Sequence, residues 1–348
     1  MCTYNGARYL REQLESIAAQ TRLPDELVIC DDRSIDDTPT MIEAFAASVS
    51  FPVRLYVNEA TLKPVRNFAK AISLCNGDII ALADQDDVWR EDKLARLASE
   101  FGARAEAGLI FSDAEMIDEH SRPLGYRAWQ AAWVEFSEAE QQVVNEGRGF
   151  EMLLRRNVVT GAAMAFRSKF RDLILPIPDD YDVMLHDYWI ALLLATVSDL
   201  FCVSEPLIKY RRHQQQHTGL PPPPSTIAGG SPAKPRGILD LPGGFPPRNQ
   251  LLTPLRDRLA AHTDERCQKA AARMEHLQVR ASLRRKTFAA RIRCALEEMM
   301  TLRYHRYSNG VPSVLHDISV PHKLFLLKTS AARLFVERKT KRAADEPR

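Results

Sequence analysis

The sequence has no long apolar run, no paired cysteines and no glycine-rich loop, and each absence excludes a class of protein. The longest apolar stretch, 189–197, includes Thr196 and is far shorter than the roughly 18 to 20 residues that span a bilayer. The opening MCTYNGARYL lacks the apolar segment of a secretory signal. The six cysteines form no CxxC pair, which argues against a disulfide framework and a zinc site. We therefore expect a cytoplasmic protein.

The residues that are present are distributed unevenly along the 348-residue chain. From Thr253 onward 21 Lys and Arg stand against 10 Asp and Glu, whereas the preceding part has 26 against 35. Nine of the 21 prolines lie between 219 and 247, a composition that does not pack regularly. These shifts predict three parts. They are an α/β domain over 1–218, a Pro/Gly-rich linker over 219–252 and a basic helical region over 253–348.

Short apolar runs alternate with helical patterns in the front part, which predicts a mostly parallel sheet flanked by helices. The expected strands are 27–30, 53–57, 78–83, 109–112, 158–166 and 200–203. The expected helices are 9–19, 39–47, 65–73, 92–101 and 187–196. In the basic region, apolar residues at helical spacing from 255 to 299 predict one long amphipathic helix. Shorter helices are expected at 314–315 and 323–336.

Two of the expected strands end in crowded carboxylates. Asp31 and Asp32 follow the first strand, and Asp84, Asp86 and Asp87 follow the third. Such carboxylates repel one another unless a cation offsets them. In an open α/β sheet, ligands bind outside the carboxyl ends of the strands. The pattern therefore indicates a divalent metal and phosphate chemistry, while a solvated turn that caps the next helix is the competing explanation for each cluster alone.

Six short motifs follow one another in the first 219 residues. In chain order they are CTYNG at 2–6, Asp31-Asp32, Asp84-Gln85-Asp86, Thr160-Gly161-Ala162, His186-Asp187-Tyr188-Trp189 and Tyr210-Arg211-Arg212-His213. As a set they resemble the family-2 inverting glycosyltransferases of GT-A fold, and among them the bacterial rhamnosyltransferase-like group that builds surface polysaccharides. That group has several apolar residues in a first strand ahead of the CTYNG element, and this sequence contains only the strand's end.

The resemblance implies a reaction and a donor site. A sugar would move from a UDP- or dTDP-linked donor, such as dTDP-rhamnose, to a hydroxyl of a glycan or lipid-linked acceptor, with inversion. Thr3 and Tyr4 would contact the donor's base, and Asp32 would accept a hydrogen bond from the pyrimidine N3–H. Asp84 would lie near the ribose, and Arg211 or Arg212 would pair with phosphate oxygens.

The resemblance also implies a metal site and a base. Asp86 would bind Mg²⁺ or Mn²⁺ bridging the diphosphate, and His213 would contact the metal or the diphosphate. Asp187 would take the proton of the acceptor hydroxyl. Because a helix N-terminus lowers a carboxyl pKa, Asp187 is an effective base only if it is partly desolvated. A plain helix cap is the competing explanation for it.

Other functions and partners stay open at this point. One alternative is a catalytically impaired GT-A-fold module that binds nucleotide sugars; another is a nucleotidyltransferase, although the opening segment has one glycine where a Gly-rich loop is expected. The basic tail would lie against anionic lipid on the inner membrane face or form a solvated helix face. Without aromatic interleaving, it does not favour nucleic acid. The tail's basic residues are Arg280, Arg284, Arg285, Lys286, Arg291 and Arg293.

Overall fold

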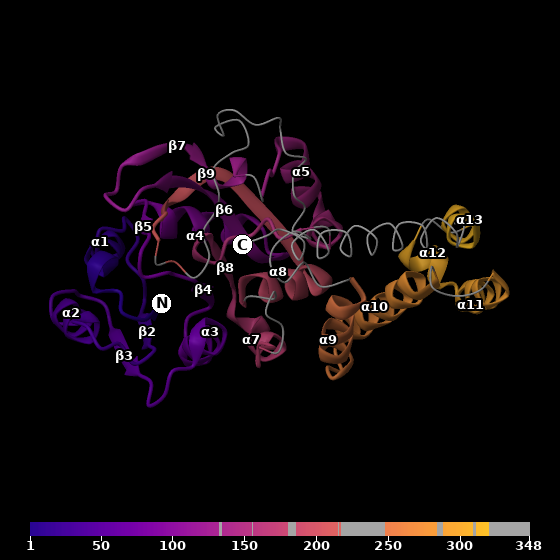
Figure 1. Ribbon diagram of the computed structural model, residues 1–348, viewed down its shortest axis with the longest axis horizontal. Coiled ribbons are helices and arrows are strands. Elements are labelled where there is room, and N and C mark those ends of the chain that lie inside the picture. Colours follow the sequence, from indigo (N-terminus) through magenta and orange to yellow (C-terminus); the bar gives the residue numbers. More distant parts are fainter. Residues whose placement is uncertain are drawn as a thin grey trace, which may run out of the picture. The chain divides into compact units, whose positions relative to one another are not determined.

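The computed structural model describes residues 1–131, 134–154, 156–179, 186–214, 216, 248–283, 288–308 and 311–319. The chain divides into two compact units, Met1–Phe245 and Pro246–Arg348. Figure 1 shows strands and helices together in the first unit and a group of helices in the second. Helix α9 (Arg248–Ala260) occupies the last five residues of the predicted linker, and the rest of that linker, 219–247, lies outside the described residues.

The first sheet contains three parallel strands in the order β1-β2-β3: β1 (Cys2–Thr3), β2 (Leu27–Asp31) and β3 (Val53–Val57). All five residues of β2 are buried, as expected for an apolar run covered on both faces. Helices α1 (Ala7–Ala18), α2 (Thr38–Ala46) and α3 (Lys63–Leu74) connect these strands and the next sheet, and α3 packs on β1 and β2 (Figure 1). The predicted strands at 27–30 and 53–57 are confirmed to within one residue.

The second sheet has six strands in the order β4-β8-β6-β9-β5, with β7 paired to β6. They are β4 (Ile79–Ala81), β5 (Val88–Trp89), β6 (Ala107–Ile117), β7 (Pro123–Arg127), β8 (Met164–Arg167) and β9 (Asp199–Arg211). Only the β6–β9 pair is parallel, so the prediction of a mostly parallel sheet is wrong for this part of the described chain. Parallel neighbours need a long crossover, and the β6–β7 connection is too short to supply one.

The helices of this region lie where the sequence placed them or in the segments between. They are α4 (Lys93–Ala103), α5 (Glu138–Val143), α6 (Gly149–Leu153), α7 (Arg171–Ile174) and α8 (His186–Val197), with the short 3-10 turn η3 (Gly161–Ala163) before β8. Turn η3 interrupts the strand predicted at 158–166, which begins only at Met164. Helix α8 is buried on nearly all sides, which agrees with the mostly apolar sequence that follows Asp187.

The second unit differs from the single long helix that the sequence predicts. Its described helices after α9 are α10 (Glu265–Leu283), α11 (Phe288–Met300), α12 (Arg303–Tyr307) and α13 (Val311–Ser319). The chain turns at Asp264, whose carboxylate accepts the N–H groups of Arg266 and Cys267 and so starts α10. The predicted helix at 314–315 lies inside α13, and 323–336 lies outside the described residues.

Of the basic residues predicted to face lipid, one is paired with an acidic residue of this unit and another is buried in it. Arg280 forms an ion pair with Asp317 at 2.6 Å and donates to Ser308 Oγ, and Arg291 is 3% exposed. Arg293 is exposed beside Glu297. None of the described helices combines the length and the apolar character that crossing a membrane requires.

Candidate active site

The loops after β1, β2 and β4 are held together by backbone contacts. Asp32 N–H donates to the Thr3 carbonyl at 2.8 Å, which places Tyr4 beside the acidic pair. The Gln85 amide then bridges to Tyr4, accepting from its N–H at 2.8 Å and donating to its carbonyl at 3.1 Å. A Cβ on Gly6 would come within 2.2 Å of Gln85 Oε1, so this position suits glycine. Gln85 is therefore a site residue to which the sequence motif assigned no role.

The Asp31 carboxylate shapes the loop that follows β2. It is buried and accepts from the hydroxyl of Thr3 at 2.7 Å and from the N–H and hydroxyl of Ser34 at 2.8 and 2.6 Å. Thr3 is 2% exposed and its hydroxyl donates to Asp31, so its side chain faces the acidic pair, and its contact with the base stays a prediction. Tyr4, in contrast, is 54% exposed and leaves its ring open to a ligand.

Asp32 lies under the start of α3. Its carboxylate accepts from Asn58 Nδ2 at 2.9 Å and from the N–H groups of Leu62 and Lys63 at 2.6 and 2.9 Å. Lys63 adopts a left-handed conformation with φ of 66°, which turns its N–H toward the carboxylate. A carboxylate has about four acceptor positions, so one further hydrogen bond from a pyrimidine can be accommodated.

Asp86 and His213 form the candidate metal pair. Asp86 Oδ2 and His213 Nε2 are 2.8 Å apart, and their side chains are 16% and 8% exposed. A carboxylate oxygen suits Mg²⁺ or Mn²⁺, and an imidazole nitrogen beside it is a ligand of divalent transition metals. Among the described residues no cluster of three or more His, Cys, Asp or Glu could hold a metal. The donor set thus fits an ion that takes its remaining ligands from a diphosphate and water.

Arg211 does not lie where the sequence predicted. It is completely buried, with Nε donating to the Asp86 carbonyl at 2.6 Å and the two terminal nitrogens donating to Ser121 Oγ at 2.8 Å and Glu12 at 2.7 Å. Arg211 N–H donates to Asp87 at 3.0 Å, so Asp87 does not cap the following helix. The prediction that Arg211 binds phosphate is wrong because its donors already hold the acidic loop in place. Arg212 remains exposed.

Asp84 of the acidic loop interacts electrostatically with Asp187. Burial, followed by the nearby charges of Asp86 and Asp187, raises the pKa of Asp84 to about 7. Asp84 is therefore within electrostatic range of both Asp86 and Asp187, and a cation beside it would relieve the repulsion.

Asp187 sits in the first turn of α8 beside turn η3. Its Oδ1 accepts from Tyr188 N–H at 2.6 Å, and Gly161 N–H also donates to the carboxylate. A Cβ on Gly161 would lie 3.2 Å from Asp187 Cβ, so glycine allows the turn to approach this closely. Burial outweighs these hydrogen bonds and raises the pKa of Asp187 to about 6. The rise in pKa caused by burial thus exceeds the fall caused by the helix N-terminus. The Asp187 carboxylate is ionised at neutral pH and is a stronger base than an ordinary aspartate.

Residues 1–172 match the family model described as glycosyl transferase family 2. This part of the chain belongs to that family. The chain is 30% identical over 168 residues to the abequosyltransferase RfbV of Salmonella typhimurium, covering 48% of this chain and 49% of RfbV. It is 36% identical over 100 residues to the dTDP-rhamnosyl transferase RfbG of Shigella flexneri, covering 27% of this chain and 34% of RfbG. The matched part of the chain thus spans about half the length of RfbV and about a third of the length of RfbG.

A solved structure supports the fold of this family 2 glycosyltransferase domain. TarS residues 1–349 of S. aureus, in complex with UDP-GlcNAc, match with a TM-score of 0.50 at 14% identity, over 81% of this chain and 70% of that one. At this identity the likeness concerns the fold alone. The GT-A fold predicted from the sequence motifs is confirmed.

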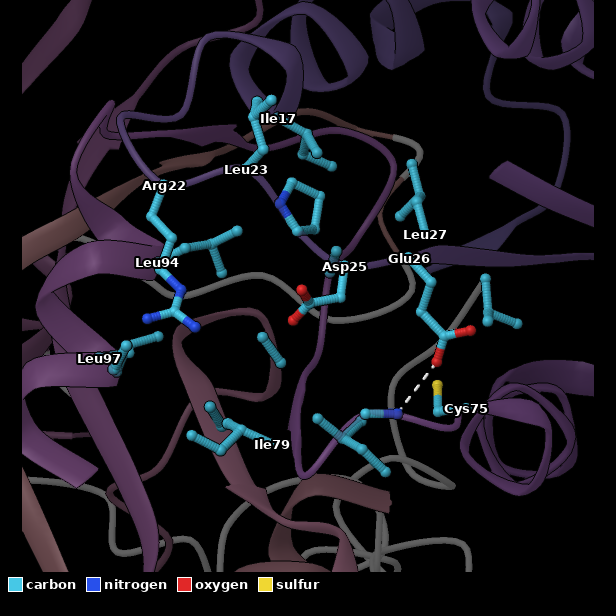
Figure 2. Close-up of a pocket in the computed structure, with 18 of the residues that line it drawn as sticks. Ile17, Arg22, Leu23, Asp25, Glu26, Leu27, Cys75, Ile79, Leu94 and Leu97 are labelled. Carbon is cyan, nitrogen blue, oxygen red and sulfur yellow. Dashed lines mark hydrogen bonds between the residues drawn. The ribbon is translucent and has the colours of Figure 1, made fainter. Parts of the chain in front are cut away.

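The family 2 domain also contains a cavity of about 280 Å³ (Figure 2). Figure 2 shows Leu27 of β2, Ile79 of β4 and Leu94 of α4 around it. Met1 also lines it, and its ammonium group donates to the Val28 carbonyl at 2.8 Å. None of the four aspartates assigned to the donor, metal or base lines this cavity, so we do not assign it to the donor.

Proposed function

We propose that the protein is an inverting glycosyltransferase. It transfers a sugar from a UDP- or dTDP-linked donor, such as dTDP-rhamnose, to a hydroxyl of a glycan or lipid-linked acceptor. The observation that carries the proposal is that Asp84 lies within electrostatic range of both Asp187 and Asp86, and the Asp86 carboxylate is 2.8 Å from His213 Nε2. The family match and the two relatives named as transferases of deoxysugars support it.

Donor recognition follows from the loops after β1 and β2. Asp32 accepts the N3–H of a uracil or thymine on the lone pair left by its three internal hydrogen bonds. The ring of Tyr4 is exposed and offers an apolar face to the base. Tyr4 directly follows Thr3, whose carbonyl accepts the N–H of Asp32. Both contacts suit a pyrimidine nucleotide.

The reaction is an in-line displacement at the anomeric carbon. Asp187 removes the proton from the acceptor hydroxyl while the hydroxyl oxygen bonds to the anomeric carbon. The bond between that carbon and the diphosphate breaks on the opposite face. Asp86 and His213 would hold Mg²⁺ or Mn²⁺, which when bound neutralises the charge that grows on the leaving diphosphate. Arg211 keeps the Asp86 loop in place through the Asp86 carbonyl.

A panel of nucleotide sugars tests this proposal. The full-length protein with Mn²⁺ is incubated with UDP-, dTDP- and GDP-linked sugars, and release of the nucleoside diphosphate is measured. We expect release from at least one UDP or dTDP donor, at a rate above that of the Asp187→Asn variant. Binding of UDP or dTDP without release from any donor would favour the catalytically impaired module instead.

We also propose a peripheral contact with anionic membrane through the basic tail, which would bring the enzyme to a lipid-linked acceptor on the inner membrane face. Arg280 is engaged by Asp317 and Arg291 is buried, so the proposed contact relies on Arg293 and the three basic residues at 284–286. Each basic group near a lipid surface contributes on the order of 1 kcal/mol.

Replacing the basic residues at 284–286 with glutamine is therefore expected to weaken binding to phosphatidylserine vesicles by more than about tenfold. Co-sedimentation measures the effect. The matched control replaces three exposed basic residues of the first unit, Arg11, Arg22 and Lys169, and should leave binding unchanged. Equal loss in both variants would indicate a general charge effect and contradict the proposed contact.

A further inference from the structure

Lys93 is a lysine with no exposed surface, at the first position of α4. Lysine is almost never fully buried unless its ammonium group is paired. Here Nζ donates to the Ala162 carbonyl at 2.7 Å and lies 3.8 Å from the centre of the Trp89 ring. The side chain therefore joins three elements that are distant in sequence: helix α4, strand β5 and turn η3.

One side of this contact leads to the proposed base. Ala162 is the central residue of η3, and its neighbour Gly161 donates its N–H to the Asp187 carboxylate. The turn approaches Asp187 so closely that a Cβ on Gly161 would be 3.2 Å from Asp187 Cβ. Any shift of the turn must therefore move the carboxylate or break its hydrogen bond. By fixing the Ala162 carbonyl, Lys93 fixes the support of Asp187.

The other side leads to the acidic loop. The Trp89 ring, 3.8 Å from the Lys93 ammonium group, belongs to β5, which begins directly after Asp87 of this loop. Burial lowers the pKa of Lys93 to about 7, and the nearby charges of Asp87 and Asp84 act in the opposite direction. The ammonium group thus contacts the strand that follows the acidic loop while it is hydrogen-bonded to the turn that supports Asp187.

We propose that Lys93 is a positioning residue for transfer, which sets turn η3, the support of Asp187, in register with the acidic loop. This inference rests on the proposed function, because the base and the acidic loop act together only in a transfer reaction. Lys93 itself reaches neither substrate nor metal in this account. Its loss should lower the rate of transfer while leaving the nucleotide site able to bind.

The test is the Lys93→Met variant, which keeps the aliphatic length and removes the cation. The control is Lys169→Met, the same change at an exposed lysine. We measure kcat and KM with the nucleotide sugar that the wild type hydrolyses fastest, the Kd of UDP with Mn²⁺ by calorimetry, and the melting temperature. We expect kcat to fall by about tenfold or more, since small misplacement of a reacting group is costly, with the Kd of UDP changed less than about threefold. The control should match the wild type.

A second variant separates hydrogen bonding from charge and covers the case in which methionine prevents folding. Lys93→Gln retains a neutral donor, and we expect its kcat to lie between those of the methionine variant and the wild type. A folded Lys93→Met protein with wild-type kcat would overturn the inference, as would proportional losses in kcat and UDP affinity. If the wild type binds UDP with Mn²⁺ but turns over no donor, the proposed function fails instead.

Discussion

Replacing Asp86 with alanine is expected to abolish the Mn²⁺-dependent binding of UDP and dTDP. Asp86 supplies the only carboxylate of the pair it forms with His213, and its oxygen lies 2.8 Å from the histidine nitrogen. Changes to residues that merely orient metal ligands cost about 10- to 100-fold in affinity. Loss of a ligand from a two-residue set should therefore cost at least about a hundredfold.

Two measurements on the Asp86→Ala variant separate metal loss from general damage. Calorimetry with UDP reports nucleotide affinity at fixed Mn²⁺, and electron paramagnetic resonance counts the bound Mn²⁺. The control is Asp25→Ala, since Asp25 is exposed and lines the separate cavity of Figure 2. Undiminished Mn²⁺ binding in the Asp86 variant, with nucleotide present, would remove Asp86 from the metal site.

Replacing Asp187 with asparagine is expected to reduce transfer by about a thousandfold while changing UDP affinity less than about threefold. Asparagine has the same shape and can still accept the N–H groups of Tyr188 and Gly161, but it cannot take a proton at neutral pH. General base catalysis contributes typically 10²- to 10⁴-fold. The loss should therefore appear in kcat and leave the nucleotide site intact.

The wild-type pH profile provides an independent check on the same residue. Burial raises the pKa of Asp187 to about 6, and the base acts in its deprotonated form. The rate of transfer should thus be constant above this pH and fall about tenfold for each pH unit below it. A limb with a midpoint near the ordinary aspartate value of about 4, or full activity in Asp187→Asn, would assign the base to another group.

The parts of the fold that were predictable are those with strong local patterns. The buried run of β2 and the helix α1, with Leu10, Leu14 and Ile17 on one face, follow directly from apolar spacing. The acidic clusters were also predictable, because they directly follow apolar strands. The strand at 158–166 was placed too early, since the apolar sequence does not reveal that Gly161–Ala163 forms a turn to support Asp187.

The errors in the candidate site have one physical origin, which is partners that are distant in sequence. Arg211 donates to Glu12, which lies 199 positions away, and no local sequence pattern indicates that contact. The same holds for Lys93, which looks like an ordinary charged residue in the sequence. In the structure its ammonium group donates to the carbonyl of Ala162, 69 positions further along the chain. The contact of the Thr3 hydroxyl with Asp31 is likewise not visible in the local sequence.

The central claim is that the acidic loops bind a nucleoside diphosphate through a divalent cation. Titration of the full-length wild-type protein with UDP and with dTDP, each with and without Mn²⁺, tests this most directly. We predict saturable binding of at least one nucleotide with Mn²⁺ present and loss of that binding when the metal is removed. Equal binding in both conditions, or none at millimolar nucleotide with Mn²⁺, would contradict the account.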